Sequence, residues 1–147
     1  METLLRLALP PEANAPGLAR GALTTLQARL HADLDLEHVQ LMVTELITNS
    51  LQHAKPAGRE WIELSVKVDG DRLRFEVKDP GGGFRAARQA YESVPANPEA
   101  EAQPPEAGYG LTIVSTLSDR SGVRWDDGTV VWFEIDLSAI DSGPAAL

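Results

Sequence analysis

The 147 residues include 22 acidic and 13 basic side chains, so the formal net charge at pH 7 is −9. This balance argues against general nucleic-acid binding, which needs clustered lysine and arginine to neutralise phosphates, but it suits a basic protein partner. The length fits one domain with a buried core, no apolar run is long enough to cross a membrane, and the absence of cysteine excludes disulfides and thiolate metal sites.

The first residues do not have the pattern of a signal peptide. Met1 to Arg6 lacks a basic region followed by an apolar core and a cleavage site, so we expect a cytoplasmic protein. Leu4 to Leu9 predicts a short strand that ends at two prolines. Leucines at helical spacing then predict a helix over residues 17–31.

A long amphipathic helix is predicted over residues 36–54, and it carries the most informative polar side chains. Glu45, Asn49 and His53 follow one another at four-residue steps, so they share one face of this helix. A polar ligand that docks on this face would explain the set, and so would an ordinary solvated helix face. The apolar stripe beside them is formed by Val39, Met42, Val43, Leu46, Ile47 and Leu51.

Two alternating segments predict an antiparallel pair of strands. Residues 61–68 and 72–78 both alternate apolar and polar side chains, and Asp69-Gly70-Asp71 between them is a hairpin signal. We expect Leu73, Phe75 and Val77 to point inward.

The second of these strands ends in a glycine-rich turn, Asp79-Pro80-Gly81-Gly82-Gly83-Phe84. Successive glycines permit positive φ angles and a close approach to the backbone, so a flat ring could lie against this turn. The Asp79 carboxylate could accept hydrogen bonds from an exocyclic amine. A simple flexible loop is the alternative interpretation.

Residues 85–107 are rich in proline and glutamate, which is typical of a functional or disordered loop. Gly108-Tyr109-Gly110-Leu111 then opens a helix predicted over residues 109–118, where bare amides and the helix dipole favour an anion. A hinge would have the same glycines. Residues 121–126 and 129–136 predict a last pair of strands, in which Trp132 and Ile135 leave the assignment of faces open, and residues 138–147 form a tail.

Together these motifs, in this order, resemble the ATP-binding domain shared by gyrases, the heat-shock chaperone, histidine kinases and mismatch-repair proteins (the GHKL or Bergerat fold). The chain looks most like the small stand-alone branch, the anti-sigma-factor serine/threonine kinases. The resemblance implies an α/β two-layer sandwich with a mixed, mostly antiparallel sheet and helices on one face. It also implies a single kinase-like domain over residues 1–137, with a lid at about 85–107.

The resemblance assigns roles to individual residues. Glu45 matches the glutamate proposed as general base, and Asn49 matches the asparagine that coordinates Mg²⁺ between the phosphates. Asp79 matches the residue that reads the adenine amine, and Thr129 matches a threonine that supports this contact. The remaining positions expected at the nucleotide are His53, which we interpret mainly as a helix-end residue, and Gly81, Gly83, Phe84, Gly108, Tyr109, Gly110 and Leu111.

One departure from the family pattern bears on activity. Related kinases often carry a basic residue between the last lid glycines, whereas here Tyr109 supplies no positive charge to the phosphates. The resemblance implies a homodimeric Mg-ATP-dependent kinase that binds a sigma factor and phosphorylates a serine of an antagonist protein. Two alternatives stay open: a non-catalytic nucleotide-gated switch, which Tyr109 favours, and an unrelated α/β domain.

Overall fold

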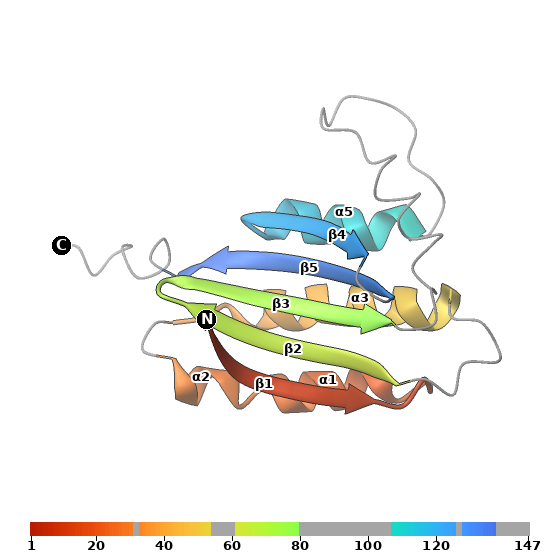
Figure 1. The fold of residues 1–147 in the computed structure, drawn as a ribbon, viewed down its shortest axis with the longest axis horizontal. Coiled ribbons are helices and arrows are strands. Elements are labelled where there is room, and N and C mark those ends of the chain that lie inside the picture. The colour runs from red at the N-terminus through yellow and green to blue at the C-terminus, as the bar shows by residue number, and fades with distance from the viewer. Residues whose placement is uncertain (31–32, 54–60, 80–106, 126–127, 138–147) are drawn as a thin grey trace, which may run out of the picture.

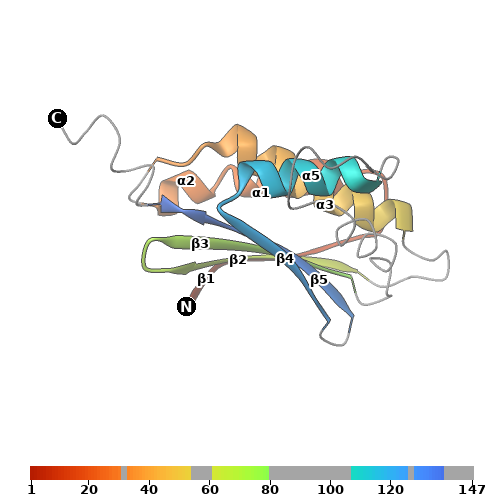
Figure 2. The ribbon, with the colours of Figure 1, turned by 90° about the horizontal axis from the view of Figure 1, so that it is seen from above.

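The computed structural model describes residues 1–30, 33–53, 61–79, 107–125 and 128–137. They form two layers, in which the helices cover one face of a five-stranded sheet (Figures 1 and 2). The elements in chain order are β1 (Glu2–Leu9), α1 (Ala15–Leu23), α2 (Leu26–Arg29), α3 (Leu36–His53), β2 (Ile62–Asp69), β3 (Arg72–Asp79), α5 (Ala107–Leu117), β4 (Arg120–Trp125) and β5 (Thr129–Asp136).

The sheet has the strand order β1-β2-β3-β5-β4, which places β3 at its centre. The predicted two-layer α/β sandwich is confirmed, and all four strand pairings in the described part of the chain are antiparallel. β2 and β3 form the expected hairpin. In its turn Gly70 has a φ of 61°, which residues with a side chain rarely adopt. β3 and β5 are neighbours although residues 80–128 separate them in the chain.

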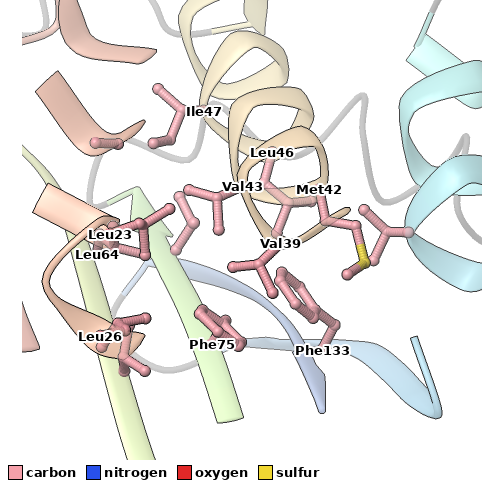
Figure 3. Packing of buried hydrophobic residues seen from close by; sticks show 14 of the residues in the cluster. Leu23, Leu26, Val39, Met42, Val43, Leu46, Ile47, Leu64, Phe75 and Phe133 are labelled. Atoms are coloured by element: carbon pink, nitrogen blue, oxygen red, sulfur yellow. The ribbon is translucent and has the colours of Figure 1, made fainter. Parts of the chain in front are cut away.

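The core lies between α3 and the inner face of the sheet. The apolar stripe predicted on α3 is buried except for Leu51, which is partly buried, and its buried residues pack above Phe75 and Phe133 (Figure 3). These two rings stack with their centroids 4.6 Å apart, across the β3–β5 pair. Leu73, Phe75 and Val77 point inward as predicted, and Ile135 joins them, which settles the face of β5 that the sequence left open.

The outer face of the sheet is covered by paired charges. Glu76 and Glu134 are only 7% and 5% exposed although they lie on this face, because long basic side chains cover them. Arg74 contacts both carboxylates, at 2.7 Å and 3.0 Å, and its guanidinium lies 4.1 Å from the centre of the Trp132 ring. The other basic partners are Lys67 and Arg124 for Glu76, and Arg72 and Arg120 for Glu134.

A glycine in β4 makes room for this arrangement. The Trp132 indole lies so close to Gly122 that a β-carbon there would come within 2.7 Å of the ring. Gly122 thereby lets the indole lie flat across the neighbouring strand, beneath Arg74.

The Glu134 contacts predict a loss of stability in acid. Burial raises the pKa of Glu134, but hydrogen bonds from Arg120 and Arg74 lower it by more than burial raises it. The pKa of Glu134 therefore lies below the ordinary 4.5. Its stabilising effect is therefore complete above the pKa of the unfolded chain and is lost as the pH falls through the lower folded pKa. Glu134→Gln should cost about 1.5–3 kcal/mol at pH 7, the usual range for a hydrogen bond to a charged group.

Urea unfolding at pH 7 and at pH 4 tests this expectation. The stability difference between the two pH values should be smaller in Glu134→Gln than in wild type. Glu63→Gln is the control, because its pair with Arg6 is long at 3.7 Å and largely exposed, so its loss should change little. An unchanged pH dependence in Glu134→Gln would refute the assignment.

Candidate functional site

The C-terminal half of α3 turns polar side chains toward the sheet. Asn49 is 3% exposed and Ser50 is fully buried, while Glu45 is half-buried one helical turn earlier. A solvated helix face therefore does not describe Asn49. His53 is the last residue of α3, and the position of its side chain lies outside the described residues.

The end of β3 meets this part of α3. Asp79 is the last residue of β3, is 4% exposed, and accepts a 3.0 Å hydrogen bond on Oδ2 from the Ser50 hydroxyl. Thr129, the first residue of β5, is directly opposite Asp79 in the ladder and is 1% exposed. Two predicted site residues that are distant in the sequence, Asp79 and Thr129, thus lie opposite each other, and Ser50 joins Asp79 to α3.

Two atoms of this buried group lack a hydrogen-bond partner among the described residues. They are the Asn49 side-chain nitrogen and the Thr129 hydroxyl oxygen. A buried polar atom without a partner costs about 1–3 kcal/mol, so native proteins rarely leave one unsatisfied. Two such atoms next to a buried carboxylate are what a polar ligand would satisfy.

A second helix begins at the same end of the sheet. α5 starts at Ala107 beside the C-terminal end of α3 (Figures 1 and 2), so residues 108–111 fall in its first turns, where a helix start was predicted. The amides of a helix N-terminus favour an anion such as a phosphate. The side chains of residues 108–111 lie outside the described part, as do the predicted contacts of Gly81, Gly83 and Phe84 and nearly all of the lid.

Ser50 is the site residue that sequence analysis missed. The signal was present, because Leu46 and Ile47 lie four and three residues before it on the buried stripe of α3. A hydroxyl at such a position is directed into the core and needs a polar partner there. Asp79 is that partner.

The site has the elements of an ATP-binding domain. They are a buried asparagine on one helix, a buried carboxylate and hydroxyl at the end of a central strand pair, and a second helix that starts beside them. The profile of the histidine kinase-like ATPase domain matches residues 9–135, and the chain belongs to this family. The sequence-based resemblance is therefore confirmed.

The curated relatives within this family are serine-protein kinases. The serine-protein kinase RsbW of Bacillus licheniformis is 32% identical over 126 residues, which cover 83% of this chain and 78% of the relative. The serine-protein kinase RsbW of Listeria monocytogenes serovar 1/2a is 29% identical over 135 residues, or 89% of this chain and 85% of the relative. Both matches extend over most of each protein.

Solved structures share the fold. The RsbU and RsbW domains of a Mycobacterium tuberculosis protein match 90% of this chain and 32% of their own with a TM-score of 0.64 at 19% identity. A chain in the structure of the SiaB–SiaC complex from Pseudomonas aeruginosa matches with a TM-score of 0.62 at 12% identity. The match covers 91% of this chain and 90% of that chain. At these sequence identities, the two structures show that the fold is shared and no more than that.

Proposed function

We propose that this chain is an ATP-dependent serine/threonine protein kinase of the anti-sigma-factor type, which sequesters a sigma factor and phosphorylates a serine of an antagonist protein. The relatives that cover most of the chain are named serine-protein kinases. The observation that supports nucleotide binding most directly is the buried group of Asn49, Asp79 and Thr129, in which two polar atoms lack partners among the described residues.

In this proposal the adenine base lies against the ends of β3 and β5. The Asp79 carboxylate accepts a hydrogen bond from the exocyclic amine, since an ionised carboxylate is only an acceptor and the amine only a donor. Thr129, opposite Asp79 in the ladder, supplies its unpartnered hydroxyl to the base or to a bridging water.

In this proposal Asn49 contacts the phosphates or the metal ion that they bind. Its buried side-chain nitrogen would donate to a phosphate oxygen, and with the amide turned over its oxygen would face Mg²⁺ instead. One amide oxygen is a fitting protein ligand, because Mg²⁺ is usually held by few protein oxygens, by phosphate oxygens and by water. When bound, Mg²⁺ supplies positive charge that neutralises the phosphate oxygens.

Glu45 is the proposed general base, one helical turn before Asn49. It removes the proton from the serine hydroxyl of the antagonist as that oxygen attacks the γ-phosphorus. The bond from the γ-phosphorus to the bridging oxygen breaks, and ADP leaves with the electron pair. The amides at the start of α5 bind phosphate oxygens and hold the transferred group in position.

The test is phosphotransfer from radiolabelled Mg-ATP to a purified antagonist protein, with the modified serine located by mass spectrometry. Incorporation on one serine is expected. Nucleotide binding without transfer to the right antagonist would instead support the non-catalytic switch, which the uncharged Tyr109 between the lid glycines favours.

Assembly and location belong to the same proposal. β1 is an edge strand of the sheet, whose unpaired backbone groups can pair with another chain, and this supports a homodimer built on β1 and the sheet. Sedimentation of the full chain only as a monomer would contradict it. In the described part of the chain, no helix has both the length and the apolar character to span a membrane. We place the kinase in the cytoplasm, where its sigma-factor partner would be.

A further inference from the structure

Ser50 makes a different kind of hydrogen bond from Ser118, which follows the last residue of α5. Ser118 donates to the carbonyl oxygen of Val114, four residues before it, which is the local bond that serine usually makes in or next to a helix. Ser50 instead reaches out of α3 and donates to the Asp79 carboxylate on β3, with both residues buried. The bond connects two elements that are 29 residues apart in the chain.

This bond holds one oxygen of the Asp79 carboxylate. The last torsion of an aspartate side chain is broad, so burial alone does not determine where its two oxygens point. A fixed donor on α3 holds Oδ2, and it thereby holds the plane of the carboxylate relative to the ladder position opposite Thr129. Asp79 acts as an acceptor in this bond, and it would act as an acceptor again toward a donor on the ligand.

From this geometry we infer that Ser50 is a positioning residue that sets the selectivity of the site for a 6-amino purine. The inference rests on the proposed function, in which Asp79 reads the base. With its carboxylate held in place, the site rewards an exocyclic amine and rejects a 6-oxo purine, whose oxygen would face another acceptor. Without the hydroxyl, the carboxylate loses its hydrogen bond to α3, and the gain in affinity from the amine falls.

The position of Ser50 gives the bond a second consequence. Ser50 is adjacent to Asn49 on α3, so the hydrogen bond ties the helix residue proposed for the phosphates to the strand residue proposed for the base. The two ends of one nucleotide are therefore read by groups that are held at a fixed spacing. Selection of the base is thereby linked to placement of the phosphates.

The test compares two nucleotides that differ only in the 6-amino group, ATP and purine riboside triphosphate, on the full chain with Mg²⁺ by calorimetry. Wild type should prefer ATP. In Ser50→Ala this preference should fall about tenfold, the size expected for losing one hydrogen bond to a charged group, while the affinity for purine riboside triphosphate stays near wild type. Ser65→Ala removes a buried hydroxyl on the outer face of the sheet and should keep the full preference.

Each other outcome is decisive. If Ser50→Ala weakens both nucleotides equally, Ser50 only supports the fold and the inference is wrong. If wild type binds ATP without preferring it to purine riboside triphosphate, Asp79 does not read the amine and the inference fails while nucleotide binding stands. If folded wild type binds neither, the proposed function itself fails. Should Ser50→Ala not fold, Ser50→Cys keeps a weak donor of similar size and should show a smaller fall in the same ratio.

Discussion

Replacing Glu45 by glutamine is expected to lower the rate of phosphoryl transfer by about 100-fold or more, in the range of a lost general base. Glutamine has nearly the same size but cannot take up the proton of the attacking serine. Glu45 is half-buried on α3 and takes no part in the hydrogen bond between Ser50 and Asp79, so Mg-ATP affinity should stay within about twofold. Single-turnover phosphorylation of the antagonist and calorimetry with Mg-ATP measure the two quantities.

Glu37→Gln is the matched control for Glu45. Glu37 is an exposed acidic residue in the first turn of the same helix, far from the end that carries Asn49, and its variant should transfer phosphate at the wild-type rate. A wild-type rate in Glu45→Gln would exclude Glu45 as the base. A parallel loss of affinity and rate would show that Glu45 positions the nucleotide instead.

Replacing Asp79 by asparagine is expected to abolish most of the stabilisation that ATP confers. A ligand at 100 times its dissociation constant stabilises a folded protein by about 2.7 kcal/mol, which raises the melting temperature of a domain of this size by several degrees. Asparagine fills the same buried space, but its amide puts a donor where the adenine amine also donates. Thermal unfolding with Mg-ATP, Mg-ADP and Mg-GTP measures the effect.

Only the adenine nucleotides should stabilise wild type, and Asp79→Asn should show little shift with any of them. Asp69→Asn provides the control, because Asp69 is exposed at the end of β2, before the turn to β3 and at the other end of the sheet. Its variant should respond to ATP as wild type does. A full ATP shift in Asp79→Asn would remove Asp79 from the site.

The helices, the strands and the polar residues on α3 could be predicted because the chain follows local rules, whereas the two-layer arrangement came from the family resemblance. The apolar stripe of α3 and the alternation of β2 and β3 specify helix and strands directly, and the structure buries the residues that these patterns select. Asp79 was predicted for the site because it ends a strand just before a glycine run. Its partner across the ladder, Thr129, came from the family resemblance, because a pairing across so much chain leaves no local pattern.

The outer face of the sheet was beyond sequence reasoning for a physical reason. Alternation predicts that Glu76 faces away from the core, whereas the sequence left the face of Glu134 open. It does not predict that basic side chains of β2, β3 and β4 cover these two carboxylates. That burial depends on the strand order, which places β5 between β3 and β4. Ser50 was missed in the same way, since its meaning comes from a carboxylate on another element.

The strand order also determines how freely the protein can vary in length. The chain leaves β3 after Asp79 and enters β5 at Thr129, and these two residues are directly opposite each other although α5 and β4 lie between them in the sequence. The cost of closing a long loop grows slowly, by about 0.6 kcal/mol for each doubling of its length. Insertions and deletions within residues 85–106 would therefore leave the register of the Asp79–Thr129 pair unchanged, so evolution can adapt this segment to new partner proteins without rebuilding the recognition of the nucleotide.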